Sequence, residues 1–308
     1  MRLCKCDAWN EQRFSLSEAA SLRRLSFNPR KDRPMALEIT LQTPSTIPLE
    51  VDAIGFEAVR GQSPDDVKRT LVQRGNKQTP LGEFFDVQGS ADDDEIVWSG
   101  DCANVKRIGT RLAFGRMRVE GNTGMHLGAE MTGGEIVVEG NAGDWAGAQM
   151  RGGSIRIRGN AGHLAGAAYR GGRKGMSGGE IIIDGEAGNE IGNSMRRGTI
   201  AIGGRAGDFL GVGMIAGSIF VFGEAGIRQG AGMKRGTIGL FGGERPPEML
   251  PTFKAAGVFQ PTWLRVYLRE LRARGFAVPG ELLEATYRRY SGDFLELGKG
   301  EILVPVAA

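Results

Sequence analysis

The sequence is poor in the residues that build most metal, disulfide and catalytic sites. Its 308 residues include only three cysteines, Cys4, Cys6 and Cys102, and two histidines, His126 and His163. There is no CxxC pair, which argues against a disulfide framework, an iron–sulfur cluster or a cysteine-based zinc site. The two histidines lack metal-ligand spacing. We therefore expect no metal site and no catalytic residue in this chain, and the scarcity of cysteine favours a reducing compartment, the cytoplasm.

Strong positive charge and long apolar runs are also missing. The formal net charge is only +3, whereas a nucleic-acid-binding domain carries a concentrated basic stripe. No apolar run approaches the roughly 18 residues of a membrane span. Residues 1–34 are basic and polar and lack the apolar core of a secretory signal. We expect neither a nucleic acid nor a membrane as partner, and we interpret residues 1–34 as a disordered extension before a functional start at Met35.

Glycine, in contrast, is abundant and concentrated in one region. Of the 50 glycines, 37 lie between Gly115 and Gly243, and there one pattern repeats six times. The repeats start 19 residues apart, except for one interval of 26. They begin at Gly121, Gly140, Gly159, Gly185, Gly204 and Gly223. A fixed period of this length is the signature of a stacked repeat architecture.

Aligning the six repeats gives columns of one residue type. The isoleucine column is Ile136, Ile155, Ile181, Ile200, Ile219 and Ile238, and the methionine column is Met131, Met150, Met176, Met195, Met214 and Met233. A second apolar residue follows each isoleucine two positions later, so both face one side of a strand. Stacking the strands at about 4.8 Å buries these columns as a continuous core. A 19-residue unit is too short for a helical crossover, so each repeat is predicted to be one coil of a β-helix or solenoid.

The glycines themselves allow a second interpretation, a set of phosphate-binding loops. No repeat ends in the Gly-Lys-Ser/Thr of a P-loop, and no helical pattern follows the glycines. Glycine adopts positive φ at little cost, so one role in tight turns accounts for all the columns. We interpret the glycines as turn residues.

The regions on either side of the repeat have a different composition. In residues 35–100, alternating apolar residues predict two strands with a turn at Pro44 and Ser45, and a helix is expected over Pro64–Gln73. Ser63 is its expected N-cap. Together these elements predict a β-rich N-terminal cap.

The C-terminal region, residues 244–308, carries helical patterns. Leucines on one stripe predict a helix over Thr262–Arg274. A second helix is expected over Glu281–Tyr290, followed by a tail strand near Ile302. The expected fold class is therefore mainly β: a right-handed parallel β-helix of about six to seven coils over residues 101–243, with the N-terminal cap and a C-terminal helical segment.

The one long interval marks a seven-residue insertion between Gly166 and Gly179. It contains three cationic residues, Arg170, Arg173 and Lys174. Insertions in repeat proteins form loops on one face, often the binding face. Arginine and lysine suit an anionic ligand or an acidic partner surface, while an ordinary solvated loop is the alternative. We predict these three residues as the candidate binding site.

The chain also resembles a known family. Its G-x-x-G-x-x-x-G coils are similar to the β-helical domain of the large glutamate synthase subunit. From Met35 onward the chain more closely resembles the C subunit of formylmethanofuran dehydrogenase, in the N-terminal strands, the Gly75–Val87 stretch, the coils and the Gly298–Glu301 tail. The coil motif is shared by several proteins, whereas the coils together with both flanks are more specific.

The resemblance implies one part of a larger enzyme. The archaeal complexes are tungsten- or molybdenum-dependent dehydrogenases. The related complex of methylotrophic bacteria transfers a formyl group from tetrahydromethanopterin to a methanofuran-type carrier and hydrolyses it to formate. In both, the resemblance implies a scaffold. Its partners would be an amidohydrolase-like A subunit, a B subunit, and, in the bacterial complex, a formyltransferase D subunit.

We expect the bacterial formyltransferase/hydrolase setting. The alternatives are a subunit of the dehydrogenase and, in a different class, an independent enzyme or carbohydrate-binding β-helix with its chemistry at the insertion. No cofactor is expected on this chain alone. The family's carrier has a glutamate-rich anionic tail, so the resemblance places Arg170, Arg173 or Lys174 near that tail or near an acidic partner.

Overall fold

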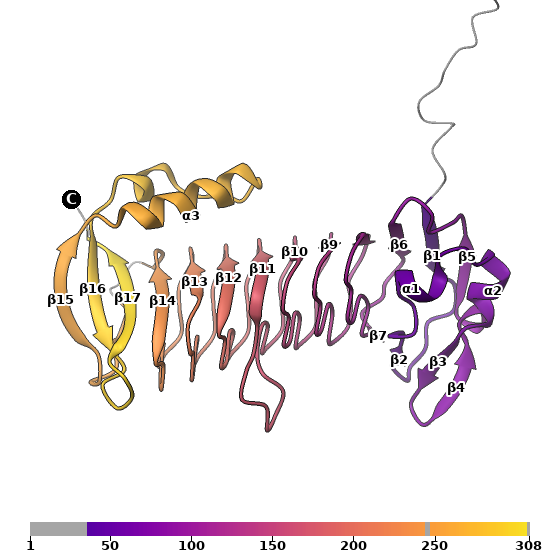
Figure 1. Ribbon diagram of the computed structural model, residues 1–308, viewed down its shortest axis with the longest axis horizontal. Helices are drawn as coiled ribbons and strands as arrows, with labels where there is room; N and C mark the ends of the chain where they lie inside the picture. The colour runs from indigo at the N-terminus through magenta and orange to yellow at the C-terminus, as the bar shows by residue number, and fades with distance from the viewer. Residues whose placement is uncertain (1–35, 244–246, 307–308) are drawn as a thin grey trace, which may run out of the picture. The chain divides into compact units, whose positions relative to one another are not determined.

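A computed structural model describes residues 36–243 and 247–306 of the chain (Figure 1). The protein is mainly β, with a 13-stranded and a four-stranded sheet. The predicted disordered extension lies outside the described residues. The strands of the large sheet, in chain order, are β1 (Leu37–Leu41), β5 (Phe85–Gln88), β6 (Glu95–Ser99), β8 (Arg116–Val119), β9 (Glu135–Val138), β10 (Ser154–Ile157), β11 (Ser177–Ile183), β12 (Arg197–Ile202), β13 (Ser218–Val221), β14 (Arg235–Leu240), β15 (Lys254–Phe259), β16 (Tyr287–Gly292) and β17 (Lys299–Pro305).

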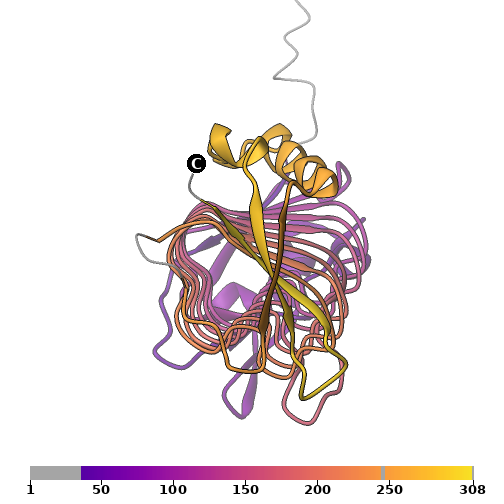
Figure 2. The same ribbon diagram turned by 90° about the vertical axis from the view of Figure 1, so that its left-hand side faces the viewer.

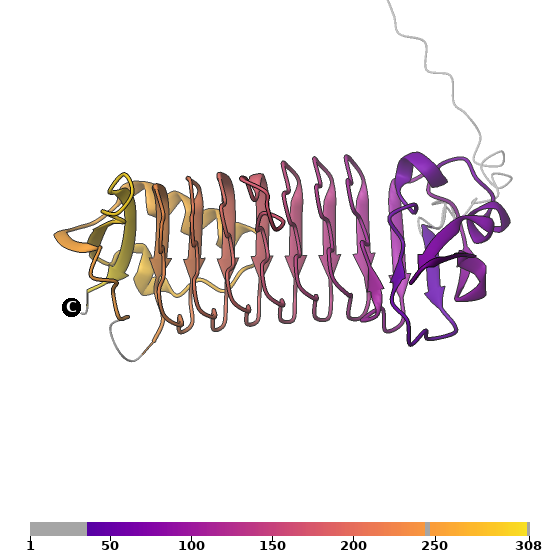
Figure 3. The same ribbon diagram turned by 90° about the horizontal axis from the view of Figure 1, so that it is seen from below.

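The repeated strands β8 to β14 lie side by side in chain order, each parallel to the next (Figure 3). Their register joins equivalent residues, so that Ile136 pairs with Ile155 and Ile155 with Ile181. Every member of the methionine column is completely buried, and no isoleucine of the column is more than 1% exposed. The predicted apolar core along the repeat is therefore confirmed.

The turns also repeat from coil to coil. Residues at one turn position, including Ala142 and Ala161, form single parallel bridges to the coils on either side. Side-chain amides add a ladder: Asn122 Oδ1 accepts from the Asn141 amide at 2.9 Å, and Asn141 Oδ1 from the Asn160 amide at 2.8 Å. Close approach requires the glycine at Gly143, because a Cβ there would lie 2.8 Å from a backbone carbon of the preceding coil. Each coil is thus bonded to the next along most of its length.

The N-terminal elements differ from the expected ones in two respects. The described elements are α1 (Phe56–Val59), α2 (Pro64–Arg69), the 3-10 turn η1 (Leu81–Glu83) and the small sheet β2 (Leu49–Glu50), β3 (Leu71–Arg74), β4 (Lys77–Pro80) and β7 (Val105–Lys106). Ser63 caps α2 through a reciprocal capping box with Asp66, as predicted for the cap. The helix does not reach Gln73, because Leu71–Arg74 pairs instead with the following strand. Strands β1 and β2 belong to different sheets and do not form a hairpin.

The C-terminal segment returns to the sheet. The predicted first helix is confirmed as α3 (Thr262–Ala273), and the predicted tail strand as β17. The second predicted helix is wrong, because only the short 3-10 turn η2 (Gly280–Leu283) forms there. The residues after it build β16, which pairs antiparallel with β15 and β17. Strand β17 pairs parallel with β14 and adds a further rung to the stack.

Helix α3 covers the outer face of the strands near this end (Figures 1 and 2). Its leucines pack on the outward residues of three successive strands, in one cluster that includes Ile182, Ala201, Phe220, Leu264, Leu268 and Leu271. At the end of the helix, Arg156 of β10 donates to the Gly275 carbonyl at 2.9 Å and forms an ion pair with Asp184. Within the described residues, no helix is both long enough and apolar enough to cross a membrane.

Candidate functional site

The insertion, Tyr169–Gly175, leaves an otherwise regular coil and rejoins it. We call it the insertion loop. The residue before it, Ala168, donates its amide to the Asn193 carbonyl of the next coil at 3.1 Å, and the residue after it, Met176, is part of the buried methionine column. Gly171 lies at φ +81° and supplies the turn. The end of the loop is held by the amide of Gly175, which donates to the Ser194 carbonyl at 2.9 Å. Both ends of the insertion loop are therefore fixed to the stack.

An aromatic cluster anchors the first residue of the loop. The Tyr169 ring lies 5.1 Å from the Trp145 ring and 5.6 Å from the His126 ring, measured between centroids. The Tyr169 hydroxyl is 3.2 Å from His126 Nδ1. His126 and Trp145 occupy the same turn position of successive coils, both at positive φ. The cluster packs the loop against the outside of two neighbouring coils.

Burial controls protonation in this cluster. It lowers the pKa of His126, an effect that the nearby cations Arg107 and Lys106 reinforce. Burial also raises the pKa of the Tyr169 hydroxyl. Around neutral pH the hydrogen bond therefore joins a neutral imidazole to a protonated phenol, which is a positioning contact and not an activated acid–base pair.

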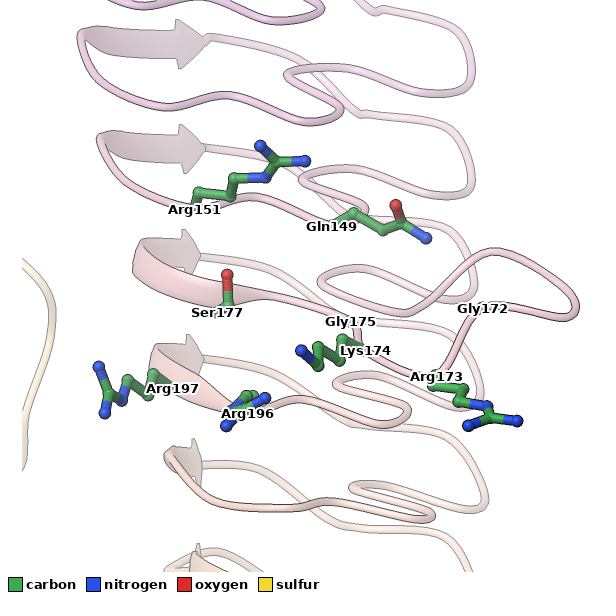
Figure 4. Close-up of a pocket in the computed structure, with 9 residues that line it drawn as sticks. All are labelled: Gln149, Arg151, Gly172, Arg173, Lys174, Gly175, Ser177, Arg196 and Arg197. Carbon is green, nitrogen blue, oxygen red and sulfur yellow. The ribbon is translucent and has the colours of Figure 1, made fainter.

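Next to the loop is an open hollow of about 680 Å³, which we call the basic pocket (Figure 4). It is lined by Gln149, Arg151, Gly172, Arg173, Lys174, Gly175, Ser177, Arg196 and Arg197. Five of these nine residues are cationic and none is acidic. All five cations are exposed, and within the described residues none of them forms an ion pair. The pocket thus concentrates positive charge that the described chain does not neutralise.

The cations come from the loop and from the coils around it. Arg151 and Arg196 each follow a methionine of the buried column, and their amides donate to the methionine of the preceding coil. Figure 4 shows Lys174 extending toward the starts of β11 and β12 at Ser177 and Arg197, while Arg173 extends away from them. The structure therefore brings together charges from three successive coils.

The structure places the three predicted site residues in different surroundings. Arg173 and Lys174 line the basic pocket, whereas Arg170 lies in the loop's turn and does not line it. Arg151, Arg196 and Arg197 were not predicted. A signal for the first two was present, because both stand directly after the methionine column in the aligned repeats.

The pocket offers donors for anions and little else. Arginine and lysine cannot act as general bases while protonated, and Ser177 has no histidine among the pocket residues to activate it. His163 is occupied elsewhere, because its Nδ1 accepts from the Asn189 amide at 2.9 Å. Burial raises the pKa of the Cys102 thiol to about 12, so this cysteine is not a nucleophile. In the part of the chain that the structure describes, no group of histidine, cysteine or acidic residues has the arrangement of a metal site.

Comparison with solved structures gives a match over most of the chain. One chain of the formyltransferase/hydrolase complex of Methylorubrum extorquens, crystallised with methylofuran, superposes with a TM-score of 0.81 and 36% sequence identity. The match covers 88% of this chain and 100% of that one. At this identity and coverage, the similarity extends well beyond the coil motif into both flanks.

Curated relatives match over a shorter stretch. The C subunit of the tungsten-containing formylmethanofuran dehydrogenase 2 of Methanothermobacter marburgensis is 39% identical over 87 residues, which are 27% of this chain and 32% of the relative. The C subunit of the molybdenum-containing formylmethanofuran dehydrogenase 1 of Methanosarcina barkeri is 39% identical over 85 residues, 26% of this chain and 28% of that protein. The chain thus matches about a third of the length of these relatives. A scan against known protein-family descriptions finds no match.

Proposed function

We propose that this chain, which belongs to the family of formylmethanofuran dehydrogenase C subunits, is a non-catalytic scaffold subunit of a formyltransferase/hydrolase complex. The observation that carries the proposal is the match along the whole length of a chain from such a complex. The chemistry of the basic pocket agrees with it, since the pocket can bind an anion and lacks an activated nucleophile.

The reaction we assign belongs to the complex. It transfers a formyl group from tetrahydromethanopterin to a methanofuran-type carrier and releases formate. The expected partners are an amidohydrolase-like A subunit, a B subunit, and a formyltransferase D subunit. In this scheme the present chain supplies no reacting group and holds its neighbours at a fixed separation. The buried, unpaired Cys102 is consistent with a reducing compartment, the cytoplasm.

A stiff fold suits this role. We propose that the repeat, residues 101–243, is a right-handed parallel β-helix, with residues 35–100 as the N-terminal cap and residues 244–308 as the C-terminal segment. The parallel register from β8 to β14 and the bridges between successive turns support this proposal. A stack in which each coil is bonded to both neighbours resists bending and keeps its two ends at a constant distance.

We assign the insertion loop and the basic pocket to the anionic part of the assembly. Arg173 and Lys174, with Arg170 on the outer turn, face either the carrier's glutamate-rich tail or an acidic surface of a neighbouring subunit. Five cations from three coils, none of them paired within the part of the chain that the structure describes, support a ligand with several negative charges, because a single carboxylate would neutralise only one of them.

Purification of the full chain, tagged in its native host, tests membership of the complex. Native mass spectrometry of the purified material should show this chain bound to several further subunits at fixed stoichiometry. Tungsten- or molybdenum-pterin bound to one of them would reassign the complex to the dehydrogenase type. A chain that purifies alone would contradict the proposal.

The pocket is tested with the triple variant Arg170→Ala, Arg173→Ala, Lys174→Ala in the same host. If the loop holds the carrier's tail, the carrier content of the purified complex falls while its set of subunits stays constant. If the loop holds an acidic neighbour, that neighbour is lost instead. Unchanged contents of carrier and of subunits would refute the assignment of the loop. Arg158→Ala, which removes an exposed arginine paired with Asp184, is the matched control.

A further inference from the structure

The loop between β16 and β17 presents three apolar side chains to solvent, and we call Phe294–Leu297 the docking tip. Phe294, Leu295 and Leu297 are 55%, 81% and 54% exposed. We propose that the docking tip is an anchor that inserts into an apolar pocket with an acidic rim on a partner protein. The proposal rests on the proposed function only in that it needs a partner, and it names a contact surface that lies outside the basic pocket.

The docking tip is held rigidly although its side chains are exposed. Asp293, which is buried, accepts the Gly232 amide of the last coil at 2.9 Å through one carboxylate oxygen and the Leu295 amide at 2.9 Å through the other. The Asp293 carbonyl accepts the amides of Glu296 and Gly298. The Phe294 amide donates to the Thr252 carbonyl at 3.1 Å. A loop fixed in this way loses little conformational entropy on binding, which is the property of a pre-organised anchor.

Exposed apolar side chains on a fixed loop bring no benefit to the isolated chain. Leu295 lies at the centre of the tip and is mostly in water, so little of its apolar surface contributes to folding. Single exposed apolar residues are common, but here three lie within four consecutive positions of one loop. Residues that contribute most to a protein interface are apolar or aromatic anchors of this kind, seated in a pocket of the partner.

Positive charge lies at the base of the tip. Arg235 and Lys299 are neighbours in the parallel register of β14 and β17, and both are exposed. Lys234 is also exposed and its Nζ lies 3.7 Å from Glu296 Oε2. Glu296 is thus the one acidic residue in the tip itself, against three cations at its base. A partner surface rimmed with aspartate or glutamate complements this arrangement.

The same corner of the coils carries the basic pocket. The coil position after each buried methionine is occupied in turn by Thr132, Arg151, Ser177, Arg196, Ile215 and Lys234, each bonded through its amide to the coil before it. The basic pocket includes Arg196 and the docking tip contacts Lys234, so the two lie two coils apart, roughly 10 Å along the stack. Figures 1 and 2 show the insertion loop and the β16–β17 loop projecting on the same side. One acidic partner surface can therefore meet both.

The observations disfavour two other occupants. A second copy of this chain, docked symmetrically through the tip, would place Arg235 and Lys299 of each copy against those of the other, and like charges oppose such contact. An anionic lipid surface would accept the cations, but it offers no shaped apolar pocket for Leu295. An acidic protein rim with an apolar pocket accommodates the leucine and leaves Glu296 paired with Lys234.

Substitution of the anchor tests the proposal in the complex purified from the native host. Leu295→Glu should reduce the recovery of at least one co-purifying partner about tenfold or more, because it replaces the anchor by a charge facing an acidic rim. The matched control is Val266→Glu on the solvent face of α3, where the valine is 67% exposed. This control should keep every partner at its wild-type level. Circular dichroism and the thermal midpoint of the free chain should be the same for both variants.

A second measurement identifies the partner's chemistry. Carbodiimide, which joins amines to carboxylates without a spacer, should link Lys299 to aspartate or glutamate of the partner that Leu295→Glu releases. Retention of every partner in Leu295→Glu, or equal loss in Val266→Glu, would overturn the proposal. Links from Lys299 only to another copy of this chain, or binding of the free wild-type chain to phosphatidylglycerol vesicles that Leu295→Glu abolishes, would also overturn it. A wild-type chain that purifies without any partner would contradict the proposed function, and the docking proposal would then be wrong as well.

Discussion

The regular coils and the insertion loop differ in how far their residues are buried and paired within the chain. In the coils, each strand pairs with both neighbours and the methionine and isoleucine columns are buried, so the backbone and the apolar columns are already in contact with the neighbouring coils. In the insertion loop, the residues from Arg170 to Lys174 are exposed. The loop's cations are unpaired among the described residues, while the coils' side-chain amides are used in ladders. The interrupted coil is therefore where we expect an anion to bind.

The first test of this contrast compares a buried column residue with a loop residue. Met195→Ala should lower the free energy of unfolding by about 2–5 kcal/mol, because it leaves a cavity in a fully buried column. Arg173→Ala should change it by no more than about 0.5 kcal/mol, as expected for an exposed side chain. Urea unfolding of the free chain followed by circular dichroism measures both. Similar losses in the two variants would show that the loop is part of the structural core.

Two glycines give a second test. Gly143→Ala should cost about 1–3 kcal/mol, because the new methyl group would meet the backbone of the preceding coil. Gly171→Ala should cost about 1 kcal/mol, because its Cβ meets nothing within 4 Å and only the positive φ of +81° opposes it. Unfolding midpoints in urea rank the two. A costlier substitution at Gly171 would mean that the loop is packed more tightly than the coil.

The aromatic anchor can be removed without altering the coils. Tyr169→Ala should weaken the attachment of the insertion loop by about 1 kcal/mol, since both ring contacts disappear. Trypsin should then cleave more quickly after Arg170, Arg173 and Lys174, while the coils stay resistant. Tyr169→Phe keeps the rings and loses only the hydroxyl contact with His126, so its cleavage rate should be intermediate. If cleavage of Tyr169→Ala equals that of the wild type, the cluster does not hold the loop.

The smallest expected effect is a dependence on pH. The pKa of His126 lies below its usual value of 6.5 in the folded chain, so the unfolded chain binds more protons between the two values. Stability from this group is therefore fully present above pH 6.5 and is lost as the pH falls from there toward the folded pKa. His126→Asn, which tolerates the positive φ, should remove this slope. The measurement is the free energy of unfolding above pH 6.5 and below the folded pKa. Equal changes with pH in the wild type and in His126→Asn would contradict the prediction.

Periodicity made most of the stack predictable. The isoleucine and methionine columns recur at one spacing. Each of these residues must stack on the equivalent residue of the next coil, which leaves few other places in the fold for it. The flanks were less predictable because their structure depends on distant partners. Leu71–Arg74 continues the pattern of α2 but pairs with Lys77–Pro80, and Tyr287–Gly292 completes an antiparallel pair with β17. Local propensity could not reveal those partners.

The candidate site also combines residues that the repeat pattern reveals with residues that only distant contacts bring together. The inserted sequence made Arg173 and Lys174 candidates, because an interruption of the repeat is visible without a structure. Arg151 and Arg196 belong to regular coils and become part of the basic pocket only through stacking, which brings residues 45 positions apart in sequence to one corner. The docking tip lies outside the repeat, so no interruption of a pattern marks it in the sequence. Its rigidity depends on Asp293 reaching the last coil, a contact between residues 61 positions apart.

Titration of the purified chain with a synthetic oligomer of glutamate tests the central claim most directly. The wild-type chain should bind the oligomer with an affinity that falls as salt is added. The variant Arg173→Ala, Lys174→Ala should bind at least about tenfold more weakly, because two charge-assisted contacts are lost, and Arg158→Ala should bind like the wild type. Equal binding by all three chains, or none by the wild type, would contradict the assignment of anion binding to the interrupted coil.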